Sequence, residues 1–276
     1  MSAIHIFNHR AMATQFQVRL AGEDATYAAQ AAQAAFALTD DLEARLSRFR
    51  ANSEIAQIAA LAVGETLRLS PPVLACLTLA KKMELATHGA FSVTAAARQT
   101  QSAPPVWTLE PETFSLRCAA GKVELDLGAI GKGFALDRMA ELLREWSCPA
   151  FLLVAGGSSI LAGDAPGNAA GWSCGLGDDG APERFYLQHS SLSGSGLAVK
   201  GKHILDPRTG AAARRQQRAW ALADTAAESD ALSTAAMVLD ETEMAAVVAA
   251  QQKWLVFLHE PAGLKIFGRR ALPPRA

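Results

Sequence analysis

Segments with helical periodicity and segments with strand periodicity follow one another along this chain without strict strand–helix–strand alternation. From Ala25 to Phe49, apolar residues recur at helical spacing with charged residues between them, which predicts a long amphipathic helix. A second helix is expected to begin after Ser70, a good N-cap followed by proline, and to end near His88, where Gly89 stops it. Because a doubly wound parallel sheet requires regular alternation, this order favours an α+β fold with mixed, largely antiparallel sheets flanked by helices.

The second half of the chain continues the same mixed order. Residues 122–127 alternate apolar and polar side chains and predict a strand, which a glycine-rich turn joins to a helix over GKGFALDRMAELLREW. The remaining expected elements are a hairpin around Gly156 and Gly157, a strand over 218–223, helices over 226–239 and from Glu241, and a closing hairpin over WLVFLHEPAGLKIFG. No low-complexity linker divides the chain. We therefore expect one domain over residues 1–276, built as a single unit or as two intertwined subdomains.

Composition narrows the classes of function. Half of the 276 residues are hydrophobic, which is ample for a sizeable buried core. The 26 basic residues balance the 27 acidic ones, so the chain has no electrostatic footprint for nucleic acid or an anionic membrane. No segment is long and apolar enough to cross a bilayer, and the N-terminus lacks a signal-peptide core, so we expect a cytoplasmic protein, or a periplasmic one if a leader was removed. The four cysteines lack C-x-x-C spacing and are expected to be buried free thiols.

Four turns are rich in glycine or hydroxyl residues: DLGAIGKG, VAGGSS, SLSGSG and DPRTG. Glycines at strand ends let backbone N–H groups approach an anion, and a helix N-terminus adds its positive dipole, so DLGAIGKG with Lys132 is a candidate phosphate-binding turn. Taken alone, each turn is better explained by chain geometry. GAIGKG is too short for a P-loop and lacks the hydroxyl after its lysine, and the chain has no G-x-G-x-x-G fingerprint, so both nucleotide-binding motifs are rejected.

Two further groups could carry chemistry. Asp230 and Thr234 are one helical turn apart, so their carboxylate and hydroxyl oxygens could share a hard cation such as Mg²⁺. The alternative is an acid favoured by the helix dipole and a threonine that bonds back to a carbonyl. His203, in HILDPRTG, could accept a proton from a hydroxyl nucleophile, although a lone histidine is more often packed or solvated.

Taken together, these elements occur in the order found in the FAD:protein FMN transferase family, often called ApbE, and the chain resembles that family over nearly its whole length. M-A-T at Met12 to Thr14 resembles the family's M-G-T start, SRFRANSEIAQI resembles its S-x-Y/F segment, and GAFSVTAA is similar to its G-x-F-D-P-T segment. DLGAIGKGFALDRMAELL, LLVAGGSSILAGD, SGSG, HILDPRTG and AESDALSTA follow in family order. The resemblance implies the family's flavin-transferase fold and an Mg²⁺-dependent transfer of FMN from FAD to a serine or threonine hydroxyl of an acceptor protein, with release of AMP.

The resemblance also implies roles for individual residues. Asp230, Thr234 and the backbone carbonyl of Ala129 would hold Mg²⁺, while Lys132 would stabilise the transition state and His203 would act as the base. The FAD site would comprise Met12, Phe49, Thr94, Asp126, Gly131, Lys132, Asp137, Gly156, Gly157, Ser195, Gly196 and His203. The implied partners are FAD and an acceptor flavoprotein or electron-transfer subunit, with no nucleic acid and no membrane insertion.

Four positions depart from the family pattern, and the segment between SGSG and His203 is also shorter. Ala13 replaces the glycine of M-G-T. Ser92 stands where the family usually has aspartate, and Ala155 and Ser158 replace its asparagine and acidic residue around the Gly-Gly pair. Two alternatives stay open. The same site would support an Mg²⁺-dependent FAD pyrophosphatase, in which water replaces the protein hydroxyl and FMN and AMP are released. The loss of acidic groups near FAD leaves open a non-catalytic FAD-binding or maturation protein.

Overall fold

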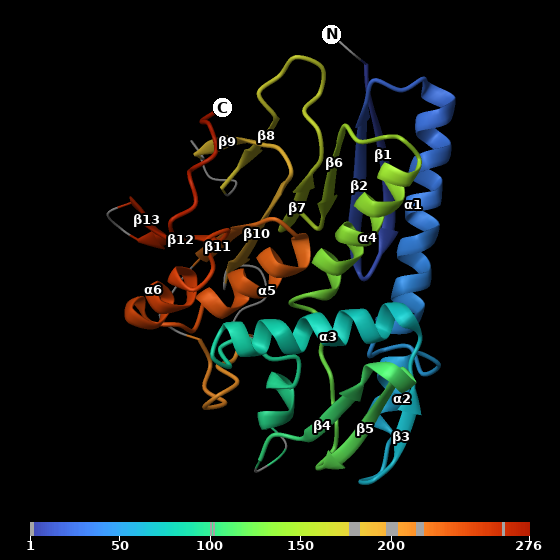
Figure 1. The fold of residues 1–276 in the computed structure, drawn as a ribbon, viewed down its shortest axis with the longest axis vertical. Helices are drawn as coiled ribbons and strands as arrows, with labels where there is room; N and C mark the ends of the chain where they lie inside the picture. The colour runs from blue at the N-terminus through green and yellow to red at the C-terminus, as the bar shows by residue number, and fades with distance from the viewer. Residues whose placement is uncertain are drawn as a thin grey trace.

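The main structural unit is an eight-stranded antiparallel sheet with the strand order β1-β2-β6-β7-β10-β11-β12-β13 (Figure 1). The computed structural model describes residues 3–99, 101, 103–176, 183–196, 204–213, 218–260 and 263–276. Every neighbouring pair in this sheet is antiparallel. Its strands are β1 (Ile4–Ala11), β2 (Thr14–Ala21), β6 (Phe151–Ala155), β7 (Ser159–Ala162), β10 (Ser190–Gly196), β11 (Arg218–Ala223), β12 (Leu255–Glu260) and β13 (Gly263–Phe267).

Three helices cover one face of this sheet, namely α1 (Ala25–Leu46), α4 (Gly131–Glu145) and α5 (Ala226–Ala236). In Figure 1, α1 lies beside α4 over the N-terminal strands, and α5 lies over β10 and β11. The main hydrophobic core fills the space between these helices and the sheet. A second apolar cluster on the other face packs the small sheet of β8 (Trp172–Gly175) and β9 (Arg184–Leu187) against the large one.

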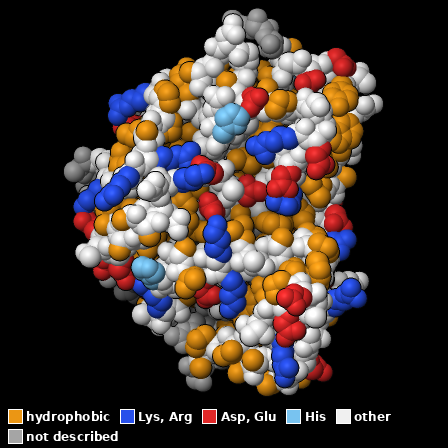
Figure 2. Space-filling view, viewed as in Figure 1, with side chains coloured by type: hydrophobic (Ala, Val, Ile, Leu, Met, Phe, Trp, Pro, Cys, Tyr) orange, Lys and Arg blue, Asp and Glu red, His pale blue; other side chains and the backbone are white. Residues whose placement is uncertain are grey.

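A three-stranded antiparallel sheet in the order β3-β5-β4 lies at the end of the molecule beyond α3 (Pro71–Ala86) (Figure 1). Its strands are β3 (Thr66–Arg68), β5 (Ser115–Ala120) and β4 (Val106–Glu110), and α2 (Glu54–Ala59) and the short 3₁₀ helices η1 (Ala95–Gln99) and η2 (Pro111–Thr113) also belong to this end. Helix α6 (Glu241–Ala249) lies instead beside α5 and contacts β13 (Figure 1). Basic and acidic side chains are interspersed over the face shown in Figure 2. The division of the chain into subdomains stays a prediction.

Most elements expected from local sequence patterns are confirmed. Helix α1 begins at Ala25, where the Asp24 carboxylate caps two backbone N–H groups, and it ends at Leu46, three residues before the expected Phe49. Helix α3 starts after Ser70 and is followed by Gly89 at φ +77°. Helices α4, α5 and α6, the strand β11 and the hairpins β6–β7 and β12–β13 also form, with α5 ending at Ala236. All four cysteines are free and buried. Within the described residues, no helix is both long and apolar enough to span a membrane.

Two structural expectations are wrong. Residues 122–127 form no strand, although Val123, Leu125 and Leu127 are buried as the alternation implied. No strand in the described part of the chain pairs with this segment, and the Asp126 N–H instead bonds the carbonyl of Val93 at 2.7 Å. SLSGSG was expected to be a turn, but it lies in strand β10 because β7 and β11 pair with it on both sides.

Candidate functional site

The first turn of α4 packs directly against the backbone of α5. A Cβ atom at Gly133 would lie 2.2 Å from the carbonyl oxygen of Ala226, which is far inside van der Waals contact. Glycine is therefore required at Gly133 for the two helices to approach this closely. This approach brings Lys132, which precedes Gly133 on α4, next to Asp230 of α5.

The carboxylate of Asp230 lies in a small polar cluster at this contact. Its side chain is only 4% exposed, and the Lys132 ammonium donates to its two oxygens at 3.2 and 3.4 Å. The Gly133 N–H and the Ser159 hydroxyl each donate to it at 3.2 Å. The same ammonium also donates to the carbonyl of Gly128 at 3.1 Å. A buried carboxylate is stable only when it is paired and hydrogen-bonded in this way.

A row of hydroxyl groups links β10 to α5 beside this cluster. Residues 191, 193 and 195 alternate along the strand, so their side chains share the face that α5 covers. Ser229 of α5 bonds both Ser191 and Ser193 at 2.8 Å, and Ser195 bonds Thr234 at 3.2 Å. Thr234 is therefore on the same side of α5 as Asp230, one turn further along. This serine spacing was visible in the sequence as a period of two, but it was interpreted as a turn.

Asp137 holds the N-terminus of α5 from the neighbouring helix. Its carboxylate accepts the N–H groups of Ala226 and Ala227 at 2.7 and 2.9 Å, and the Thr225 side chain caps Glu228 N. Burial raises the pKa of Asp137 to about 7. Both carboxylate oxygens are thus engaged by a helix terminus, while the predicted contact of Asp137 with FAD stays a prediction.

A second cluster surrounds the turn that precedes α4. Asp126 accepts the Gly128 N–H at 2.9 Å and lies 3.5 Å from the Arg48 guanidinium. That guanidinium stacks on the ring of Phe49, 4.6 Å from its centroid, and Phe49 is 83% exposed. Thr94 is buried. It lies near Asp126 because the carbonyl of the preceding residue, Val93, accepts the Asp126 N–H. The structure therefore brings Thr94, Asp126 and Phe49 together. The sequence interpretation did not include Arg48, whose guanidinium contacts both Asp126 and Phe49.

Two hairpin turns carry the predicted residues Met12, Gly156 and Gly157. Met12 and Ala13 have φ values of +49° and +56°, and the two glycines have φ values of +60° and +68°. The turns abut, since the Gly156 N–H donates to the carbonyl of Gln15 at 2.9 Å and a Cβ on Gly156 would lie 2.4 Å from Thr14 Oγ1. Glycine suits this conformation, whereas Ala13 pays a steric cost for it.

The DPRTG turn is anchored to α6. Gly210 has φ +75°, and its N–H bonds the carbonyl of Asp206 at 2.7 Å. Arg208 bridges Asp206 at 2.9 Å and Glu243 at 2.6 Å. His203, the predicted base, lies outside the described residues. Ser195 and Gly196 end strand β10 within them, while Gly131 begins α4 and Ala129 lies in the turn before it.

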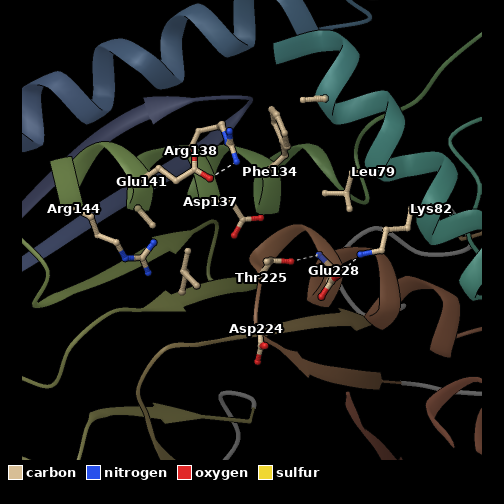
Figure 3. A pocket seen from close by; sticks show the side chains of 13 residues that line it. Leu79, Lys82, Phe134, Asp137, Arg138, Glu141, Arg144, Asp224, Thr225 and Glu228 are labelled. Carbon is tan, nitrogen blue, oxygen red and sulfur yellow. Dashed lines mark hydrogen bonds and ion pairs between the residues drawn. The ribbon is translucent and has the colours of Figure 1, made fainter. Parts of the chain in front are cut away.

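A cleft of about 320 Å³ opens between α3, α4 and the start of α5 (Figure 3). Figure 3 shows two ion pairs at this cleft, between Arg138 and Glu141 and between Lys82 and Glu228. Asp137 is the only one of the described predicted site residues that lines it. Its other lining residues are Ala75, Leu79, Lys82, Phe134, Arg138, Ala140, Glu141, Arg144, Leu161, Asp224, Thr225 and Glu228. This cleft was not expected from the sequence, because residues of several elements far apart in the chain form it.

The fold is that of an α+β protein. In its candidate site, Lys132 and Asp230 meet where α4 and α5 touch, beside a row of hydroxyl groups on β10 and α5. Such a site can hold a phosphate group and a hard cation. The sequence profile of the ApbE family matches residues 12–258. The chain belongs to the ApbE family.

Two curated relatives are each named FAD:protein FMN transferase. The protein from Klebsiella pneumoniae (strain 342) is 25% identical over 210 residues, which cover 63% of this chain and 64% of the relative. The protein from Treponema pallidum (strain Nichols) is 30% identical over 158 residues, which cover 47% of this chain and 41% of the relative. The matched segments thus span less than two thirds of either relative's length.

Solved structures of flavin transferases share the fold. The apo form of the flavinyl transferase ApbE from Pseudomonas stutzeri superposes with a TM-score of 0.82 at 18% identity, covering 96% of this chain and 94% of that one. The flavin transferase ApbE from Vibrio cholerae gives a TM-score of 0.81 at 18% identity and covers 97% of both chains. These likenesses confirm the expected α+β architecture with mostly antiparallel sheets.

Proposed function

We propose that this protein transfers FMN from FAD to a serine or threonine hydroxyl of an acceptor protein and releases AMP. The observation that carries the proposal is the Lys132–Asp230 pair at the abutting ends of α4 and α5, beside a row of hydroxyl groups. Membership of the ApbE family and the names of the two curated relatives support the choice of FAD as donor. The acceptor would be a flavoprotein or an electron-transfer subunit.

The proposed reaction is a displacement at phosphorus. The acceptor oxygen forms a bond to the FMN phosphorus as the bond to the AMP oxygen breaks, the hydroxyl proton passes to His203, and AMP leaves. Lys132 would offset negative charge on the phosphate oxygens from its position at the N-terminus of α4, where anions are also favoured by the helix dipole. Ser195 and Gly196 would lie along the pyrophosphate.

The flavin end of FAD is proposed to lie toward the second cluster and the two hairpin turns. Phe49 offers an exposed aromatic face for the isoalloxazine, with Arg48 on the ring and Asp126 beside it. Thr94, Met12 and the Gly156–Gly157 turn complete the proposed flavin site. Arg48 would hold Phe49 in place, since one guanidinium contacts both Phe49 and Asp126.

A divalent cation is proposed to be held by Asp230, Thr234 and the carbonyl of Ala129. The donor chemistry fits Mg²⁺, which prefers oxygen ligands and is commonly bound by one or two carboxylates together with substrate phosphates. The described residues contain no group of three or more acidic, histidine or cysteine side chains that could hold a metal by themselves. A site with a single carboxylate therefore depends on oxygens from the substrate. When bound, Mg²⁺ would offset charge on the bridging oxygens.

An incubation with FAD, Mg²⁺ and a candidate acceptor tests the proposal. Intact mass of the acceptor and chromatography of the nucleotides are measured for the wild type and for Asp230→Asn. Flavinylated acceptor with an equal amount of AMP is the expected result, and Asp230→Asn should lose it. Asp164→Asn is the control, since Asp164 is about half exposed and, within the described residues, its carboxylate forms an ion pair with His189 alone. Free FMN and AMP without acceptor labelling would instead identify a hydrolase, and unchanged bound FAD would identify a binding protein.

A further inference from the structure

All lone-pair positions of the Asp230 carboxylate are used within the described part of the chain. An ionised carboxylate offers about four acceptor positions on its two oxygens. One oxygen accepts from Lys132 and Ser159, and the other accepts from Lys132 and the Gly133 N–H. A metal ion that bound Asp230 would therefore have to displace one of these donors.

Two of the three donors are fixed in place. The Gly133 N–H belongs to the helix turn whose backbone touches Ala226, so it cannot move without separating α4 from α5. Ser159 is fully buried on strand β7, between β6 and β10. Neither group can leave the carboxylate at low cost.

Lys132 is the donor that can leave. Its side chain is flexible and 21% exposed, and its contacts to the two oxygens, at 3.2 and 3.4 Å, are long for charge-assisted hydrogen bonds. Once it leaves Asp230, the ammonium requires another anion. The pyrophosphate of FAD at the N-terminus of α4 would supply one.

We infer that Lys132 and Mg²⁺ compete for Asp230, so that the ammonium occupies the carboxylate in the FAD-free protein and moves to the pyrophosphate when FAD and Mg²⁺ bind. The inference rests on the proposed function for the identity of the two ligands. It follows that Lys132 weakens Mg²⁺ binding in the absence of FAD and makes the binding of FAD and Mg²⁺ interdependent.

Titration calorimetry with Mg²⁺ alone, without FAD, tests the competition. Lys132→Met should bind Mg²⁺ about ten-fold more tightly than the wild type, because no ammonium has to be displaced. Lys132→Arg keeps the charge and the pairing, and it should show no gain. Lys82→Met is the matched control, since Lys82 also pairs with a carboxylate of α5, Glu228, and its loss should leave Mg²⁺ affinity unchanged.

Thermal unfolding gives a second readout that does not depend on activity. Without metal, Lys132→Met leaves the Asp230 carboxylate without its cation and should unfold at a lower temperature than the wild type, and Mg²⁺ should raise its Tm by more than it raises that of the wild type. Equal or weaker Mg²⁺ binding by Lys132→Met, with binding still lost in Asp230→Asn, would overturn the competition and leave the proposed metal site intact. Undiminished binding by Asp230→Asn would instead overturn the metal site itself.

Discussion

The contact between α4 and α5 at Gly133 makes a sharp prediction for Gly133→Ala. The added methyl group would lie 2.2 Å from the Ala226 oxygen, 2.5 Å from its carbonyl carbon and 2.7 Å from Ala227 Cα. All three atoms are backbone, so no side chain can rotate away and the helices must separate. Overpacking of this kind lowers the free energy of unfolding by about 3 kcal/mol at the upper end of its usual range. The better helix propensity of alanine offsets about 1 kcal/mol of this loss.

We therefore expect Gly133→Ala to lower the free energy of unfolding by about 2 kcal/mol, with a fall in Tm of several degrees. The transfer reaction should suffer more than stability does. Separating the helices moves Lys132 away from Asp230, and a misplacement of about 1 Å can lower the rate on the order of 100-fold. Urea unfolding and initial rates of AMP release measure the two effects.

Gly131→Ala is the matched control for stability. Gly131 is in the same turn of α4 and has no positive φ, and among the described atoms its added Cβ would meet just the Cβ of Leu127 at 3.6 Å, an ordinary contact. The free energy of unfolding of Gly131→Ala should equal or exceed that of the wild type. If Gly133→Ala proves as stable as Gly131→Ala, the close backbone approach does not hold the two helices together and the argument for the site's geometry fails.

Three further predictions concern stability. Burial raises the pKa of Asp137 from 3.8 to about 7 in the folded protein, so its contribution to stability is full below about pH 4 and is lost as the pH rises through 7. The free energy of unfolding of the wild type, measured with urea, should therefore fall across this pH range relative to that of Asp137→Asn. Equal pH dependence of the two proteins would contradict this. Ala13→Gly should raise stability by up to about 1 kcal/mol, because glycine adopts the positive φ of this position without strain. Ala44→Gly, at an exposed position of α1, should lower stability by a similar amount, and thermal melts that shift in the same direction for both variants would refute the strain at Ala13. The hydrogen bond from Arg208 lowers the pKa of Glu243, so the contribution of Glu243 to stability is present above pH 4.5 and is lost as the pH falls. Glu243→Gln should therefore reduce the loss of unfolding free energy at acid pH. An unchanged acid dependence would count against the Arg208–Glu243 pair.

Local patterns were sufficient for the helices and for the tight turns. Asp24 caps the start of α1 with its side chain, α3 starts after Ser70 with proline in its first turn, and Gly89 follows the end of α3. The Gly156–Gly157 pair takes the two positive φ values that a tight type I′ turn requires. These features depend on residues close together in the chain, so sequence alone determined them. The order of the motifs likewise pointed to the family.

Tertiary pairing decided which extended segments became strands. Residues 122–127 have the alternation of a strand, yet no described segment pairs with them, whereas SLSGSG has turn-like composition but lies between β7 and β11. A β-strand is defined by hydrogen bonds to a partner that is distant in sequence, and the strand's own residues do not specify that partner.

Only the tertiary structure decided the geometry of the candidate site. Lys132 and Asp230 are 98 residues apart, and they meet because Gly133 lets the backbones of α4 and α5 touch. The sequence predicted both residues but assigned Asp230 to a metal and Lys132 to phosphate, without the contact between them. Helical spacing determines which side of a helix a residue occupies, but the packing of two helices determines which residues face each other across the gap.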